Sequence, residues 1–212
     1  YAHVIAPNRT GKSSLIAATS ARLQNNGFRV ATLDLAQISE RDGGSDPGRW
    51  YYSFAYRLLR QLRLKIDLQN WWQDKSIVSN RQRLVEFYVE VILENIAEPV
   101  VVFIDEIQSL KDKPFAEHLL ASIREALSSR TTEPEFLRLT FVLAGECEPE
   151  SLVTNPSLSP FAVSQEIRLG DFTRDDLDAF AMELNLSRSD AALALDRIYY
   201  WTSGHPYLSQ KL

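Results

Sequence analysis

Residues 3–14 read HVIAPNRTGKSS and decide the fold. The first part, 3–6, is a short apolar run typical of a buried strand, and apolar residues recur at helical spacing from Leu15 to Leu23. Gly-Lys-Ser between a strand and a helix indicates a phosphate-binding loop, because consecutive backbone N–H groups at a helix start can cradle phosphate oxygens. A chance Gly-Lys-Ser in a surface loop is the alternative, and the placement argues against it. We expect the loop to bind phosphate through Pro7, Asn8, Arg9, Thr10, Gly11, Lys12, Ser13 and Ser14.

Two side chains of this loop are candidates for chemistry. The Lys12 ammonium is expected to reach the terminal phosphates of a nucleotide, and the Ser13 hydroxyl is expected to ligate Mg²⁺. Ala6 stands where the motif usually begins with glycine. A methyl group is tolerated there if Ala6 keeps a negative φ, but its presence weakens the match to the motif. We expect this departure to affect hydrolysis more than binding.

The second motif is the segment 100–106, VVVFIDE. Five apolar residues without alternation predict a strand that is buried on both faces, as in parallel sheets covered by helices. A carboxylate after such a strand lies at the carboxyl edge of the sheet, where open α/β folds bind ligands. We therefore expect Asp105 to hold the same Mg²⁺ as Ser13, and Glu106 to act catalytically by polarising a water. The alternative for Glu106 is that it caps the following turn or is simply solvated.

Apolar patterns along the rest of the chain predict an α/β protein. Strands alternate with helices up to about Gly170, after which only helices are predicted. The predicted division is a P-loop core over 1–170 and a helical unit over 171–212. Thr173, with Asp176 three residues later, is expected to cap the first helix of this unit. Strands are expected over 3–6, 28–35, 100–104, 136–144 and 163–169, helices over 15–23, 50–62, 79–96, 115–127, 174–184, 190–201 and 206–212, and a loop over 41–48.

Composition bounds the class of protein. The 212 residues are 45% apolar and 24% charged, as in globular proteins, and the apolar run at 100–104 is far shorter than the ~20 residues of a membrane span. A net charge of −5 disfavours a surface that grips nucleic acid as a whole. A single cysteine, Cys147, and the absence of an export leader lead us to expect a cytoplasmic protein. Because the sequence begins at Tyr1 and stops at Leu212 within a predicted helix, we expect a segment of a larger multidomain protein.

A third motif, WTSGHPYL at 201–208, joins two predicted helices, and by itself its Gly-x-Pro indicates only a tight turn. With the two motifs above, it makes the chain resemble the AAA-like branch of the STAND ATPases. These are nucleotide switches of bacterial multidomain proteins, related to NB-ARC and NACHT modules and to archaeal-type AAA+ ATPases. The more specific parts of the resemblance are SPFAVSQEIRLGDFT at 159–173 and YWTSGHPYLSQKL at 200–212. The resemblance implies a five-stranded parallel P-loop sheet in the order 5-1-4-3-2 with a C-terminal helical lid, in which Pro206 packs against adenine.

The resemblance also implies ATP or ADP with Mg²⁺ as cofactors, self-association, and flanking effector or sensor domains. Two departures concern the catalytic centre. Related ATPases often place a polar or basic sensor where Glu146 stands here, and a glutamate is a poor sensor of a γ-phosphate, which leaves Arg138 or no residue for that role. Candidates for an arginine finger, most of which we expect to be ordinary surface residues, are Arg124, Arg130, Arg168 and Arg174.

The leading hypothesis is an ATP-binding, slowly hydrolysing switch that couples nucleotide state to lid position and oligomerisation in a signalling or defence protein. Two alternatives stay open: a nucleotide-bound scaffold that does not hydrolyse, and an initiator- or loader-type AAA+ ATPase acting on DNA, which the acidic balance disfavours. Arg57, Arg60 and Arg63 recur at threefold spacing on a predicted helix. A solvated face is the interpretation that we favour for them, and a partner surface is the alternative.

Overall fold

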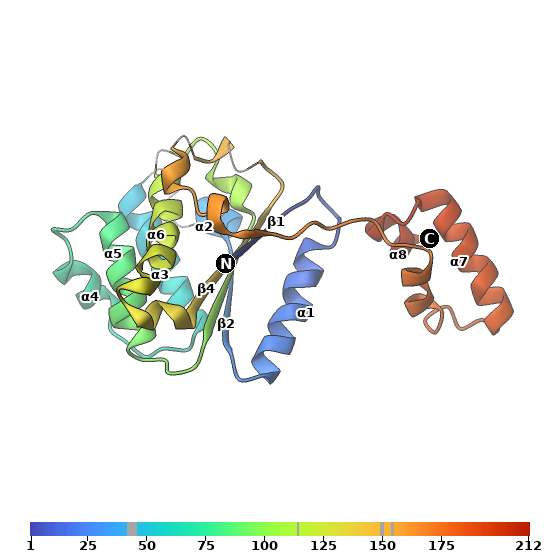
Figure 1. The fold of residues 1–212 in the computed structure, drawn as a ribbon, viewed down its shortest axis with the longest axis horizontal. Helices are drawn as coiled ribbons and strands as arrows, with labels where there is room; N and C mark the ends of the chain where they lie inside the picture. Colours follow the sequence, from blue (N-terminus) through green and yellow to red (C-terminus); the bar gives the residue numbers. More distant parts are fainter. Residues whose placement is uncertain (42–45, 114, 149–150, 154) are drawn as a thin grey trace.

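The chain folds into an α/β body, followed by a group of helices that lies apart from it (Figure 1). Within the described residues the sheet has the strand order β2-β3-β4-β1-β5, and all of its pairs are parallel. This is the predicted order 5-1-4-3-2 read from the other edge, so the predicted fold is confirmed. The strands are β1 (Ala2–Ile5), β2 (Arg29–Asp34), β3 (Val100–Asp105), β4 (Leu139–Gly145) and β5 (Gln165–Glu166). The computed structural model describes residues 1–41, 46–113, 115–148, 151–153 and 155–212.

Helices cover both faces of the sheet, and they do so unequally. Figure 1 shows α1 on one side of the strands and α3 to α6 on the other. The apolar cluster beneath α1 is the smaller of the two, and the cluster on the opposite face holds most of the core. The helices of the body are α1 (Lys12–Asn25), α2 (Leu35–Arg41), α3 (Pro47–Gln61), α4 (Leu68–Asp74), α5 (Asn80–Glu86), η1 (Phe87–Leu93), η2 (Ile107–Leu110) and α6 (Ala116–Ser128), with short turns η3 (Ser129–Thr131), η4 (Pro134–Arg138), η6 (Pro156–Leu158) and η7 (Phe161–Val163).

Strand β3 lies in the interior of the sheet and is packed on both faces. All six of its residues are buried, as its continuous apolar sequence predicts. Val101 and Phe103 belong to the cluster beneath α1, whereas Val102 and Ile104 belong to the cluster on the opposite face. Because alternate side chains are packed on both sides, the carboxyl end of β3 is fixed in position, and with it Asp105.

The predicted helix over 79–96 is present, but its geometry changes along its length. It begins at Ser79, whose side chain accepts a hydrogen bond from the Gln82 N–H at 3.2 Å. From Phe87 onward it continues as the π-helical segment η1. Of the predicted loop over 41–48, residues 42–45 lie outside the described residues. At its two ends the prediction is wrong, because Arg41 ends α2 and α3 begins at Pro47.

Strand β4 begins at Leu139 rather than at 136, because the residues before it form η4. The Arg138 guanidinium donates hydrogen bonds to the carbonyl oxygens of Leu93, at 2.8 Å, and of Ile96. Leu93 is the last residue of η1, where a carbonyl has no partner further along the helix, and Ile96 lies just beyond that end. The contact holds η4 against the end of that helix, and pairing in β4 starts at Leu139, three residues later than predicted.

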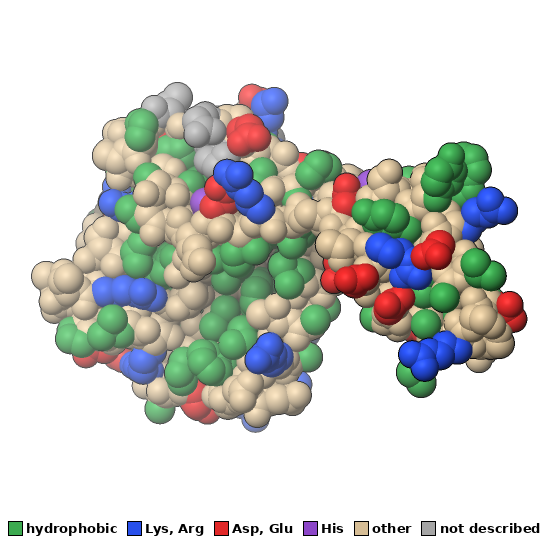
Figure 2. Space-filling model, turned by 45° about the vertical axis from the view of Figure 1, so that its right-hand side comes forward, with side chains coloured by type: hydrophobic (Ala, Val, Ile, Leu, Met, Phe, Trp, Pro, Cys, Tyr) green, Lys and Arg blue, Asp and Glu red, His purple; other side chains and the backbone are tan. Residues whose placement is uncertain are grey.

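The C-terminal helices follow a two-residue β5, where the predicted strand covered 163–169. The Thr173 N–H donates to Asp176 Oδ2 at 2.7 Å and the Asp176 N–H donates to Thr173 Oγ1 at 3.2 Å, so the predicted cap is confirmed. The element that it starts is a 3₁₀ helix rather than the longer helix predicted over 174–184. Figure 2 shows this group of helices as a separate lobe joined by a narrow neck. Its elements are η8 (Asp175–Phe180), α7 (Arg188–Thr202) and α8 (Pro206–Lys211).

None of the helices in the described part of the chain has the length and apolar character that a membrane crossing requires.

Candidate nucleotide-binding site

The predicted phosphate-binding loop connects β1 to α1 and lies open to solvent. Pro7, Asn8 and Arg9 are exposed, as are Ser13 and Ser14 at the helix start. Such a loop leaves its backbone N–H groups, together with those of the first turn of α1, available to an anion. The exposure of these residues is compatible with the predicted phosphate-binding role.

Backbone conformation explains the residues at both ends of the loop. Gly11 precedes α1 with a φ of +97°, which an L-residue rarely adopts. Ala6 is buried and is not among the described residues with a positive φ, and its N–H donates to the Gly145 carbonyl at 3.1 Å. The alanine in place of the usual first glycine thus extends the pairing of β1 with β4 without backbone strain.

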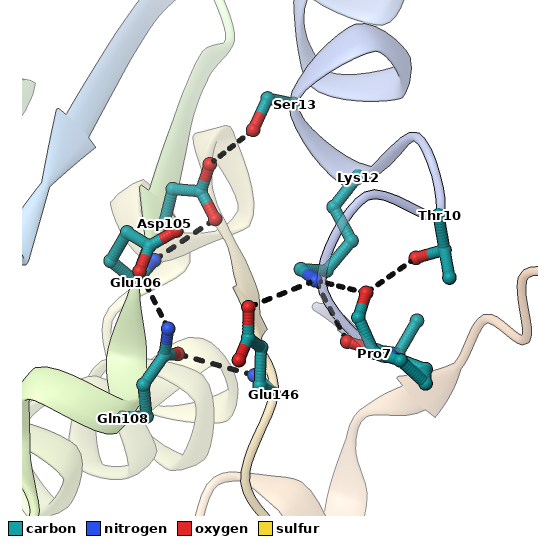
Figure 3. Close-up of polar contacts among 9 residues, drawn as sticks. Pro7, Thr10, Lys12, Ser13, Asp105, Glu106, Gln108 and Glu146 are labelled. Atoms are coloured by element: carbon teal, nitrogen blue, oxygen red, sulfur yellow. Dashed lines mark hydrogen bonds and ion pairs between the residues drawn. The ribbon is translucent and has the colours of Figure 1, made fainter. Parts of the chain in front are cut away.

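The Lys12 side chain folds back onto the loop (Figure 3). Its ammonium donates to the carbonyl oxygens of Ala6 and Pro7, both at 2.7 Å, and only 6% of its surface is exposed. Glu146 Oε1 lies 3.9 Å from the same nitrogen. The loop thus holds its own lysine in place, beside a carboxylate at the end of β4.

Ser13 and Asp105 meet across the site. The Ser13 hydroxyl donates to Asp105 Oδ2 at 3.1 Å, which joins the start of α1 to the end of β3. Asp34, at the end of β2, pairs in register with Asp105. The predicted metal ligands therefore lie together at the carboxyl edge of the sheet, and their oxygens are of the kind that Mg²⁺ prefers.

Glu106 follows Asp105 in a left-handed conformation, with a φ of +60°. Its N–H donates to Asp105 Oδ1 at 2.9 Å, and its Oε2 accepts a hydrogen bond from Gln108 Nε2 at 2.5 Å (Figure 3). Burial, and then the carboxylates of Asp105 and Asp34, raise the pKa of the Glu106 carboxyl above its usual value. Glu106 is thus a positioned carboxyl group whose proton affinity is increased, as suits a general base.

Gln108 is a site residue that the sequence analysis missed. While its amide nitrogen donates to Glu106, its Oε1 accepts from the Glu146 N–H at 3.1 Å, so it bridges the ends of β3 and β4. A Cβ on Gly145 would lie 2.7 Å from that Oε1 and 2.4 Å from Ile107, which explains the glycine there. The sequence Asp-Glu-Ile-Gln places an amide two residues after Glu106. Only the turn after Glu106 brings that amide within hydrogen-bonding distance of the Glu106 carboxylate.

The C-terminal helices reach the loop through α8. The Arg9 guanidinium lies 4.6 Å from the centre of the Tyr207 ring, a cation–π contact between the loop and the residue after Pro206. Pro206 itself is buried at the start of α8. A Cβ on Gly204 would lie 1.9 Å from the carbonyl oxygen of Phe172, and Phe172 donates its N–H to the Gly204 carbonyl at 2.8 Å. The predicted corner is therefore clamped to the chain that leads into the lobe.

The other arginines considered for catalysis have structural contacts. Arg138 lies at the amino end of β4, away from the site, where it bonds helix carbonyls. Arg130 donates to the Leu139 carbonyl at 2.7 Å, Arg168 pairs with Glu166, and Arg174 pairs with Asp178 and Asp196. The structure brings none of these four arginines to the loop.

A parallel sheet in this order, with a P-loop after β1 and an acidic pair after β3, defines a P-loop ATPase fold of the AAA+ type. The sequence profile of the AAA-like domain matches residues 2–212. The chain belongs to this AAA-like domain family.

Relatives and solved structures agree with this assignment. A WD repeat-containing protein of Synechocystis sp. is 31% identical over 216 residues, and the match covers all of this chain but 18% of that protein. The fold is similar to the Aeropyrum pernix ORC1 protein solved in complex with DNA (TM-score 0.57, 17% identity, 100% of this chain and 52% of that one). It is also similar to AMPPCP-bound DnaA from Aquifex aeolicus (TM-score 0.52, 12% identity, 99% and 52%). The chain thus spans a small part of the Synechocystis protein and about half of these solved chains.

Proposed function

We propose that this domain binds ATP with Mg²⁺, hydrolyses it slowly, and acts as a STAND-type nucleotide switch within a multidomain signalling or defence protein. The observation that supports this most directly is the 3.1 Å hydrogen bond from Ser13 to Asp105. It places a hydroxyl and a carboxylate where the helix after the P-loop meets the acidic strand end. Both are oxygen donors of the kind that Mg²⁺ prefers, and the exposed loop beside them supplies amide donors for phosphate.

The residues of the loop divide the binding of the nucleotide between them. Backbone N–H groups from Asn8 to Ser14 are proposed to bind phosphate oxygens, while Pro7 shapes the turn. On binding, the Lys12 ammonium would replace its hydrogen bonds to the Ala6 and Pro7 carbonyls with hydrogen bonds to phosphate oxygens. Ser13 and Asp105 would hold the metal. The bound Mg²⁺ and nucleotide supply the transferable phosphoryl group and the charge that stabilises it.

Glu106 is proposed to accept the proton of the attacking water at its carboxylate. Its raised pKa favours this role, because a base is most effective when its pKa lies near the working pH. The hydrogen bond from Gln108 fixes the direction of that carboxylate. We propose that Gln108 sets how often Glu106 faces the water, and so contributes to slow turnover.

The positions of the arginines also support the proposal of slow turnover. Stabilising the charge of a transferring phosphoryl group commonly requires an arginine, and three of the four candidates, Arg130, Arg168 and Arg174, are engaged elsewhere in the same chain. The fourth candidate, Arg124, lies on α6. We propose that a neighbouring subunit supplies this arginine, so that self-association accompanies activity.

The C-terminal lobe is proposed to act as the lid over residues 171–212. Pro206 would pack against adenine, and Tyr207 already contacts Arg9 of the loop. Because this contact joins the lid to the loop that holds the phosphates, a change of nucleotide would favour one lid position over another.

The first experiment identifies the nucleotide that co-purifies with the protein. Wild type, Lys12→Ala and the control Lys65→Ala, which changes an exposed lysine away from the loop, are denatured and their supernatants are run on ion exchange. We expect ADP or ATP from the wild type and the control, and at least about tenfold less from Lys12→Ala. Absence of bound nucleotide from the wild type, together with no binding of added ATP and Mg²⁺, would refute the proposal.

The second experiment separates a hydrolysing switch from a nucleotide-bound scaffold. The hydrogen bonds of Lys12 to the loop and of Gln108 to Glu106 are compatible with a scaffold as well. ATP turnover is measured for wild type, Glu106→Gln and Gln108→Ala. We expect Glu106→Gln to bind ATP and to lose turnover by about a hundredfold or more. Unchanged turnover in Glu106→Gln would favour the scaffold.

A further inference from the structure

A groove of about 950 Å³ runs along the outer edge of β2, between the end of α1 and the exposed side of α3. Gln24 and Phe28 line it at the α1 end, and residues of α3 from Tyr52 to Gln61 form the opposite wall. No residue of the loop 7–14 is among the described residues that line it. The groove therefore lies outside the phosphate-binding loop, and it approaches the nucleotide site only at Asp34, which pairs in register with Asp105.

The groove carries a concentrated positive charge on a chain that is acidic as a whole. Among the described lining residues four are arginines, and Asp34 is the one carboxylate. The guanidinium of Arg29 is fixed by a hydrogen bond to the Leu62 carbonyl. Arg60 lies 6.0 Å from the centre of the Tyr56 ring and is exposed, as is Arg63. Arg57 and Arg60 lie on α3, and Arg63 follows the end of that helix with a φ of +58°, so the predicted helical spacing does not extend to Arg63. All three arginines nevertheless line the same groove.

The floor of the groove is a sheet edge with open backbone groups. The Arg29 N–H donates to the Pro99 carbonyl at 2.9 Å, on the side of β3. Since N–H and C=O groups alternate sides along a strand, those of Val30 and Thr32 point outward into the groove. An edge strand of this kind accepts a further strand by backbone pairing.

We propose that this groove binds an extended acidic segment of a separate partner protein as an added strand beside β2. Charge complementarity selects an acidic partner. The backbone at Val30 and Thr32 offers both donors and acceptors, which a peptide backbone can match and a phosphodiester backbone, rich in acceptors only, cannot. The six residues of β2 define a docked length of about 20 Å. This inference does not depend on nucleotide binding.

The two faces of β2 also define the sequence pattern expected of the partner segment. Ala31 and Leu33 face the cluster that includes α3, whereas Val30 faces the cluster beneath α1. Alternate side chains of an added strand would therefore point toward the α3 arginines, and those between would point toward Phe28. The partner is expected to alternate acidic with apolar residues.

The test uses a fluorescein-labelled octapeptide of alternating Glu and Val, with binding followed by fluorescence anisotropy. Arg60→Glu/Arg63→Glu reverses two charges of the groove, and Arg188→Glu/Arg197→Glu makes the same change at two exposed positions of α7. We expect saturable binding to wild type, at least about tenfold weaker binding to the groove variant, and unchanged binding to the α7 variant. A peptide of alternating Lys and Val should not bind.

Backbone pairing is tested in the wild-type protein, so that the outcome does not depend on the folding of a variant. Methylating alternate amide nitrogens of the peptide removes donors but keeps its charge, and we expect methylation in the register that faces β2 to abolish binding. Equal binding of both methylated registers would overturn the proposal, as would equal weakening by the two double variants or no binding to wild type. Tighter binding of oligothymidylate with the same dependence on Arg60 and Arg63 would assign the groove to nucleic acid instead.

Discussion

The α/β body and the C-terminal lobe are held together by different means. The body buries large aromatic side chains completely, among them Trp50, Phe54 and Phe141. Among the described residues, the buried apolar side chains of the lobe are fewer and smaller than those of the body. Trp201, on α7, is 68% exposed. The lobe depends instead on polar and backbone contacts, such as that between Thr202 and Ser209. The body can therefore act as a rigid platform, whereas the lobe belongs to the part of the molecule that opens most easily.

The largest contrast is expected between aromatic truncations in the two regions. Phe141→Ala removes a fully buried ring from β4 and should lower the free energy of unfolding by about 3–5 kcal/mol. Trp201→Ala removes an exposed ring from α7 and should change it by less than about 0.5 kcal/mol. Urea denaturation of both variants measures this difference. Similar losses would mean that the lobe has a core of its own.

A smaller effect, confined to the lobe, is expected from Gly204→Ala. The added methyl would collide with the Phe172 carbonyl at a φ of +83°, so we expect the lobe to lose about 1–3 kcal/mol of protection. Hydrogen exchange should speed up in α7 and α8 and stay unchanged in β3. Gly170→Ala is the matched control, because a Cβ there meets nothing within 4 Å. Faster exchange throughout the body would show that the two regions unfold together.

The contact between body and lobe is expected to be weaker still. A double-mutant cycle of Arg9→Ala and Tyr207→Leu should give a coupling free energy of about 0.5–1 kcal/mol, as for other partly exposed cation–π pairs. The measured quantity is the free energy of opening of the α8 amides in hydrogen exchange. Strict additivity of the two substitutions would place the lobe out of contact with the loop in solution.

The smallest effect concerns pH at the edge of the body where β1 pairs with β5, the last strand before the lobe. His3 of β1 is buried and its Nδ1 lies 2.7 Å from the Ser164 hydroxyl, just before β5. Burial lowers the pKa of His3 below its ordinary value of 6.5, so protonation favours the unfolded chain. The corresponding stability is present above that ordinary value and is lost as the pH falls through it toward the lowered pKa.

We expect His3→Gln, which cannot be protonated there, to flatten the fall in Tm between about pH 7.5 and 5.5. His118→Gln is the control on α6, a region outside this edge. An equally steep fall in the Tm of His3→Gln would place the pH sensitivity elsewhere.

The parts of the molecule that could be predicted are those that short-range patterns specify. A strand followed by Gly-Lys-Ser and a helix, and five apolar residues followed by Asp105, each depend on neighbours in sequence. The strand order came instead from the family resemblance. The contacts that were missed, Gln108 with Glu106 and Tyr207 with Arg9, depend on backbone turns of positive φ and on the placing of the lobe, which no local pattern encodes.

The clamp between Phe172 and Gly204 has a mechanical consequence. It joins the point where the chain enters the lobe directly to the corner before α8. A pull on the linker is therefore transmitted to Pro206 and Tyr207 without passing through η8 and α7. The elements between the two ends of the clamp, η8 and α7, are thus bypassed by this direct contact.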